Sequence, residues 1–176
     1  MDAAFAELLA PLTESRRAHT IEVGRKVEQV AHLVPEDIRD EVVTAAYLHD
    51  VGYGYPVSGF HPLDGAELLE GRGYSPIICH LVAFHSASTV EADVRGIDAE
   101  ALDQFALAAE VPGIGMANDL VWWADMTTGP TGGTLTLDER LADIRVRYPE
   151  GTLVRTAIDR AEPLLRGAVQ RASGSM

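Results

Sequence analysis

Residues 36–51 contain the feature that most constrains the fold of this chain. Pro35 can set the first turn of a helix, and apolar side chains then lie on nearly every side of the segment. A helix that is apolar all round is a buried one. The segment ends in the adjacent pair His49 and Asp50, and Gly52 can supply the left-handed residue that closes a helix. The sequence therefore predicts a buried helix with a histidine and an aspartate at its carboxyl end.

Helical spacing of apolar residues continues along the whole chain. No stretch alternates apolar and polar residues as a strand would, and Thr136 with Glu139 has the pattern of a capping box. Residues 88–97 and 127–134 are expected to be loops. We predict an all-α fold of seven to nine helices in a single domain over residues 1–176. The expected helices cover residues 2–12, 13–34, 36–51, 61–70, 76–87, 98–111, 116–126, 136–148 and 152–171.

Composition and charge exclude several classes of partner. The 176 residues are 47% hydrophobic, which suits a globular domain with a real core. A formal net charge of -13 argues against nucleic acids and anionic membranes, because both require a basic surface. Apolar runs fall well short of the ~20 residues of a membrane span. The first residues do not resemble a secretory signal, and the single cysteine, Cys79, excludes an internal disulfide. We therefore expect a cytoplasmic protein.

Several histidines and acids are candidates for a metal site, which needs ligands from different segments. Each one alone has an ordinary explanation as a core, surface or helix-end residue. His19 lies within a helix, one turn after Arg16 and on the same face. His61 opens a helix, and His85 ends another. Asp125 ends an apolar helix, where the helix dipole disfavours an acid unless a cation neutralises it.

The other two histidines are excluded by their direction. At ~100° per residue, His32 is turned roughly 220° from His19. By the same rule His80 is turned about 140° from His85. Neither can easily share a centre with its neighbour. The candidate metal ligands are therefore His19, His49, Asp50, His61, His85 and Asp125.

These candidates follow the order H…HD…H…H…D, and short patterns surround three of the histidines. The patterns are R-x-x-H-[ST] at Arg16, His19 and Thr20, H-x-x-x-G-A at His61, Gly65 and Ala66, and F/Y-H-[ST] at Phe84, His85 and Ser86. The whole set resembles the HD-domain superfamily of metal-dependent phosphohydrolases, in its branch with two metals. Bacterial HD proteins that hydrolyse symmetrical dinucleoside polyphosphates look most similar. The resemblance covers about residues 15–126, and the helices expected over about 136–171 lie outside it.

The resemblance implies a dinuclear metal site. Asp50 would bridge two divalent or transition metal ions and be the central catalytic residue. One metal would be held by His19, His49 and Asp125, and the other by His61 and His85. Because imidazole ligands favour transition metals, iron or manganese is expected, with zinc or magnesium as alternatives. Two metals ~3.5–4 Å apart would activate a water for in-line attack on a nucleotide or another small phosphate ester or anhydride.

One departure from the superfamily concerns the position after the His-Asp pair. HD phosphodiesterases of the HD-GYP type have a lysine there, in HD-x-G-K, whereas this chain has Tyr53. Arg16 or Arg17 could supply the missing charge, because a forked guanidinium suits phosphate. Arg16 and Tyr53 are therefore the expected substrate-binding residues.

Two other functions are compatible with the same ligands. Some HD-fold proteins are diiron oxygenases that cleave a small organic substrate with O2. The missing lysine fits that class, in which Tyr53 would be a gating residue. A non-catalytic binding module, in which metals only hold the helices together, is the third hypothesis.

Overall fold

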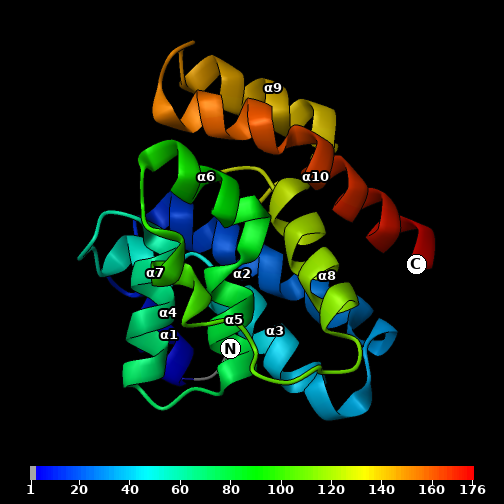
Figure 1. The fold of residues 1–176 in the computed structure, drawn as a ribbon. Helices are drawn as coiled ribbons and strands as arrows, with labels where there is room; N and C mark the ends of the chain where they lie inside the picture. The colour runs from blue at the N-terminus through cyan, green and yellow to red at the C-terminus, as the bar shows by residue number, and fades with distance from the viewer. Residues whose placement is uncertain (1–2) are drawn as a thin grey trace.

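The computed structural model describes residues 3–176 and confirms the predicted all-α fold. Within these residues there is no strand, and only an isolated bridge joins Thr128 to Thr134. None of the helices they form is long and apolar enough to cross a membrane. The α-helices, drawn in Figure 1, are α1 (Ala3–Leu9), α2 (Glu14–Val30), α3 (Arg39–Leu48), α4 (His61–Gly71), α5 (Pro76–Ala83), α6 (Ser88–Arg95), α7 (Ala99–Asp103), α8 (Ile114–Met126), α9 (Leu137–Arg147) and α10 (Leu153–Ser175).

Helix α3 is the buried helix that the sequence predicts. It packs against α2, α5 and α8, and Ala45, Ala46 and Leu48 are completely buried. Gly24 of α2 permits the close approach of α2 to α3, because a Cβ atom there would overlap the ring of Tyr47. The carboxyl end of α3 is thereby fixed in the middle of the molecule.

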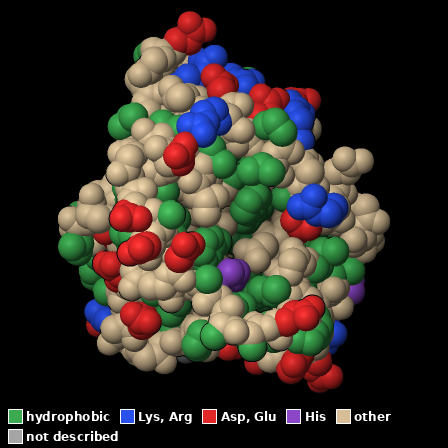
Figure 2. Space-filling view, in the orientation of Figure 1, with side chains coloured by type: hydrophobic (Ala, Val, Ile, Leu, Met, Phe, Trp, Pro, Cys, Tyr) green, Lys and Arg blue, Asp and Glu red, His purple; other side chains and the backbone are tan. Residues whose placement is uncertain are grey.

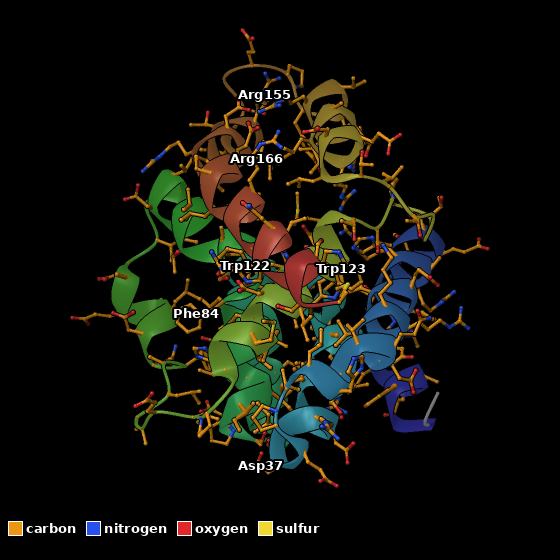
Figure 3. The ribbon with its side chains drawn as sticks, turned by 90° about the vertical axis from the view of Figure 1, so that its right-hand side faces the viewer. Asp37, Phe84, Trp122, Trp123, Arg155 and Arg166 are labelled. Carbon is orange, nitrogen blue, oxygen red and sulfur yellow. The ribbon has the colours of Figure 1, made fainter. Side chains whose placement is uncertain are left out.

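The last two helices form a separate layer over this core. Helix α10 crosses α6 and α8, and α9 packs beside it at the top of Figure 1. Leu141, Ile144 and Leu165 belong to a second, smaller apolar cluster between them. Figure 2 shows a group of basic side chains over α9 and α10. In Figure 3, Arg155 and Arg166 lie in this layer, at the end of the molecule opposite Asp37.

The structure differs from the sequence prediction after α5. Residues 88–95 form helix α6 instead of a loop, and α7 ends at Asp103 instead of near residue 111. Ser86 and Ala87 have positive φ angles of 47° and 59°, which break the chain direction between α5 and α6. Helix α6 is mostly polar, and its packing against α10 stabilises it. Local spacing cannot reveal a contact of that kind.

Gly52 also has a different role from the expected one. It does not have a positive φ, and α3 already ends at Leu48. Gly52 lies in the 3-10 turn Val51–Gly54, which packs against the start of α4. A Cβ atom on Gly52 would lie 2.0 Å from the carbonyl oxygen of His61. Glycine is therefore required because two backbone segments meet here.

This contact predicts the effect of adding one methyl group. Gly52→Ala forces the turn and α4 apart, so we expect a loss of about 1–3 kcal/mol in the free energy of unfolding, measured by urea denaturation. The matched control is Gly71→Ala, where a Cβ atom meets nothing within 4 Å. The control should leave stability unchanged or raise it by up to about 1 kcal/mol. Equal effects of the two substitutions would contradict the proposed contact.

Candidate metal centre

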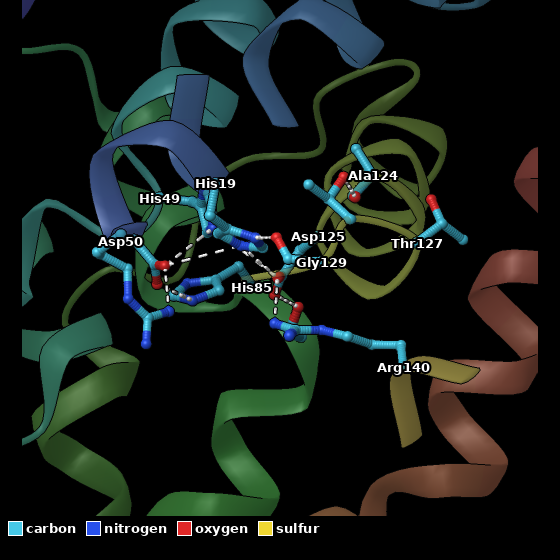
Figure 4. Close-up of polar contacts among 12 residues, drawn as sticks. His19, His49, Asp50, His85, Ala124, Asp125, Thr127, Gly129 and Arg140 are labelled. Carbon is cyan, nitrogen blue, oxygen red and sulfur yellow. Dashed lines mark hydrogen bonds and ion pairs between the residues drawn. The ribbon is translucent and has the colours of Figure 1, made fainter. Parts of the chain in front are cut away.

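The structure brings all six predicted residues together from five parts of the chain. Figure 4 labels five of them, all except His61. His19 comes from α2, and Asp125 comes from the last turn of α8. The pair His49 and Asp50 follows α3. The two groups of residues with ligand atoms within 4.8 Å of one another are His19, His49 and Asp125, and Asp50, His61 and His85.

The carboxylate of Asp50 lies between the histidines of the first group and those of the second. Its Oδ2 atom is 3.5 Å from Nε2 of His49 and 3.9 Å from Nε2 of His19. Its Oδ1 atom is 3.4 Å from Nε2 of His61 and 3.9 Å from Nε2 of His85. Each oxygen therefore faces a different group, which is the arrangement that a bridging carboxylate requires.

Backbone carbonyls orient three of the four imidazoles. Nδ1 of His49 is 2.8 Å from the carbonyl oxygen of Ala46, and Nδ1 of His85 is 2.6 Å from that of Val82. Nδ1 of His19 is 2.9 Å from the carbonyl oxygen of Gly129. A carbonyl oxygen only accepts, so Nδ1 of each ring carries the proton and donates. The Nε2 lone pair of each ring is then free for a metal.

The electrostatics of the site also favour metal binding. Burial lowers the pKa of His49 to about 4, and it lowers the pKa of His61 well below its usual value. Burial alone would raise the pKa of Asp50, but His49 and Arg16 outweigh it, so this pKa is lowered. Metal ligands must be neutral imidazoles and ionised carboxylates, and these shifts favour both states at neutral pH.

A buried nitrogen atom of His49 without a hydrogen-bond partner in the described part of the chain indicates whether a metal would fit the site. Nε2 of His49 is enclosed, and it has no hydrogen-bond partner among the residues that the structure describes. Buried polar atoms are nearly always satisfied, so an orphaned nitrogen needs an explanation. A metal ion between His49, His19 and Asp125 supplies the missing partner. The donor set of imidazoles and carboxylates therefore fits a divalent metal.

Comparison with known families agrees with this geometry. The sequence profile of the HD domain matches residues 16–109, which is more than half of the chain. The chain belongs to the HD-domain family. Neither the curated proteins nor the solved structures gave a match. HD domains form a superfamily of metal-dependent phosphohydrolases that bind divalent metals. In this HD domain, Asp125 and helices α9 and α10 lie beyond the matched residues.

The two predicted substrate-binding residues lie at the mouth of the centre. Arg16 donates from Nη1 to Oδ2 of Asp50 at 2.7 Å. Its guanidinium carbon lies 4.2 Å from the centre of the Tyr53 ring, and that ring stacks on His61 at 3.9 Å. Arg16 and Tyr53 both line a cavity of about 110 Å³ above Asp50. Their roles toward a substrate remain predictions.

The two excluded histidines belong to neither group of candidate ligands. His32 is exposed, in a 3-10 turn after α2. His80 lies 3.1 Å through Nδ1 from the carbonyl oxygen of Phe105, on another side of α5. Both exclusions agree with the structure, but not for the expected reason. His32 lies beyond the end of α2 and His85 beyond the end of α5, so a continuous helix joins neither pair.

Residues outside the predicted set of ligands lie against Asp125. Ser86 donates from Oγ to Oδ2 of Asp125 at 2.5 Å, and Nη2 of Arg140 is 3.7 Å from Oδ1. Helix α8 is also tied to the end of α5, because the Trp122 indole donates to the carbonyl oxygen of Phe84 at 2.9 Å (Figure 3). These contacts hold Asp125 close to His85, the residue that follows Phe84. They join segments too distant in sequence to be read from spacing.

Lys26 is a further residue that the sequence analysis did not select. It is the only lysine in the chain, and it lies two turns after His19 on the buried face of α2. Its Nζ atom donates to the carbonyl oxygen and Oγ1 of Thr127, at 2.6 and 3.0 Å. It thereby holds the loop whose Gly129 carbonyl orients His19. Its seven-residue spacing from His19 is the signal that could have identified it.

This role gives a prediction for Lys26→Met. The substitution removes both Lys26 hydrogen bonds to Thr127, whose carbonyl keeps, among the described residues, only the backbone N–H of Leu135, so the free energy of unfolding should fall by about 1–3 kcal/mol. Metal affinity should also fall, because the Gly129 carbonyl loses its support. Calorimetric unfolding and metal titration measure the two effects. Arg25→Met, which removes an exposed charge from the same helix, is the control. Wild-type values for Lys26→Met would show that the lysine positions nothing.

Proposed function

We propose that this HD domain is a phosphohydrolase that cleaves a small phosphate ester or anhydride with two divalent transition metals. The observation that carries the proposal is the Asp50 carboxylate, whose two oxygens face separate groups of ligand atoms. Four imidazoles at the site favour iron or manganese over magnesium.

The proposed ligand sets follow the two groups in space. His19, His49 and Asp125 would hold one metal, His61 and His85 would hold the other, and Asp50 would be shared. When bound, the metals supply positive charge and lower the pKa of coordinated water toward neutrality. The protein contributes fixed ligand directions, through the carbonyl oxygens that accept from Nδ1 of three histidines.

Arg16 and Tyr53 have roles that do not depend on metal chemistry. Arg16 holds Asp50 in place, and its guanidinium also lines the cavity, where it can bind phosphoryl oxygens. Donors aimed at the oxygens where negative charge develops stabilise a transition state. Tyr53 forms one wall of the cavity by stacking on His61, and it limits the space for the leaving group.

The stacking of Tyr53 on His61 also keeps the oxygenase alternative open, since a gating residue would have to lie against a ligand in this way. The two functions differ in what they consume. A phosphohydrolase needs only water, whereas an oxygenase requires O2 to cleave its organic substrate. Oxygen dependence therefore separates them.

The test is turnover by protein loaded with Fe(II) or Mn(II), on a panel of phosphate esters and anhydrides, with and without O2. We expect phosphate to be released at the same rate with and without O2, as measured by a colorimetric phosphate assay. Asp50→Ala is the inactive control. Cleavage that occurs only in the presence of O2 would establish the oxygenase instead. Failure across the panel would favour the binding module.

A shared Asp50 also predicts an unusual metal stoichiometry. Asp50→Ala should empty both positions, because it removes a ligand from each, whereas His85→Ala should remove one ion of the two. Metal content after desalting, measured by mass spectrometry with inductively coupled plasma, distinguishes these results. Full metal content in Asp50→Ala would refute the bridging role.

A further inference from the structure

Arg140 is a buried cation beside the metal centre, and it has nitrogen atoms without hydrogen-bond partners among residues 3–176. It comes from α9, beyond the part of the chain that matches the HD profile, and only 7% of it is exposed. Its Nε and Nη1 atoms are enclosed and have no hydrogen-bond partner in the described part of the chain. Nη1 lies 3.7 Å from Oδ2 of Asp143, and Nη2 lies 3.7 Å from Oδ1 of Asp125. Both distances are too long for hydrogen bonds.

A buried guanidinium with unused donors is costly, so this position requires a partner. Asp125 does not serve as that partner, because its Oδ1 atom is too far from Nη2 for a hydrogen bond and its Oδ2 atom accepts from Ser86. Arg140 does line the cavity above the centre, and Figure 4 shows it reaching toward Asp125. Its Nη2 atom is the nitrogen that is not enclosed, and a charged guanidinium donor at such a place suits a phosphate oxygen.

The charges of the site point to the same kind of ligand. Asp50 and Asp125 balance Arg16 and Arg140 before any metal is present. Glu91 also lines the cavity, but Arg95 pairs with it at 2.6 Å. Two divalent ions therefore leave an excess of positive charge, which an anion with more than one negative charge would neutralise best. A terminal phosphate has two negative charges near neutral pH, whereas a phosphodiester has one.

The rest of the cavity restricts the organic part of this ligand. Helices α9 and α10 line it with the apolar side chains of Ile144, Val154 and Ile158. Arg147 lies beside them and is paired with Asp143 at 2.7 Å. The volume of about 110 Å³ is well below the ~300 Å³ at which pockets for drug-sized ligands begin. The enclosed space is therefore better suited to a compact phosphomonoester than to a dinucleotide.

From these observations we propose that Arg140 binds the terminal phosphate of a compact phosphomonoester with an apolar organic group. The layer of α9 and α10 would thus determine specificity for a centre built by the other helices. This inference rests on the proposed function, because it assigns the substrate class of the same site.

The test uses the metal-loaded full-length protein and inorganic phosphate as the probe, with binding measured by calorimetry. Arg140→Gln should weaken phosphate binding at least about tenfold, because it removes a charged hydrogen-bonding group. Metal content should stay at the wild-type level. Arg145→Gln is the matched control, since it removes the same charge from α9 but faces Asp159 and Glu162 of α10. The control should bind phosphate normally.

Two further measurements complete the test. Dimethyl phosphate, a singly charged diester, should bind the wild-type protein at least about tenfold more weakly than phosphate. Arg140→Lys should recover only part of the lost affinity, because an ammonium keeps the charge but differs from a guanidinium in shape and is more strongly hydrated.

Several results would overturn the inference. They are unchanged phosphate affinity in Arg140→Gln, loss of metal from that variant, no phosphate binding by the wild-type protein, or equal affinity for phosphate and dimethyl phosphate. Failure of the proposed function is recognised separately. A protein that binds phosphate through Arg140 but releases none from any ester would retain this inference and lose the hydrolase.

Discussion

The buried carboxylate of Asp50 is the constraint on which the rest of the structure depends. It is only 3% exposed, and an isolated charge at such a depth would be strongly destabilising. Arg16 donates to one oxygen, and the imidazoles of both ligand groups surround the pair. Every segment that carries one of these partners therefore has to reach the same point. The fold can be understood as the arrangement of helices that meets this requirement.

Helix ends meet the requirement in a consistent way. Helices α3, α5 and α8 all finish at the centre, and the carboxyl end of a helix has a partial negative charge that favours cations. The same ends supply the carbonyl oxygens of Ala46 and Val82, which orient His49 and His85. Helix α4 starts at the centre with His61, close to the turn that contains Gly52. Ligand direction and local electrostatics thus have one structural origin.

The sequence predicts the helical fold because apolar spacing and turn residues are local signals. It also predicts which six side chains meet. His32 and His80, which the sequence analysis leaves out, belong to neither group in the structure. It does not predict Lys26 or Arg140. Lys26 acts through Thr127, which lies far away along the chain. Arg140 reaches the cavity because α9 packs over the centre after a loop whose geometry the sequence does not predict. Helix α6 was also not predicted, because it is stabilised by packing on α10, a contact between distant parts of the chain.

The layer of α9 and α10 has a different role from the helices that carry the candidate ligands. The helices within the HD match, together with α8, assemble the ligands, whereas α9 closes the cavity above them. Chemistry and selectivity can therefore vary separately. In this chain the added layer contributes a cation and apolar side chains to the cavity, which under the proposed function would select a compact anionic substrate.

The most direct test of the central claim is a crystal structure of the manganese-loaded protein, with the metals located by anomalous scattering. We expect two peaks about 3.5–4 Å apart, one on each side of the Asp50 carboxylate, with each oxygen bound to a different ion. A single ion, or two ions that do not share Asp50, would contradict the account.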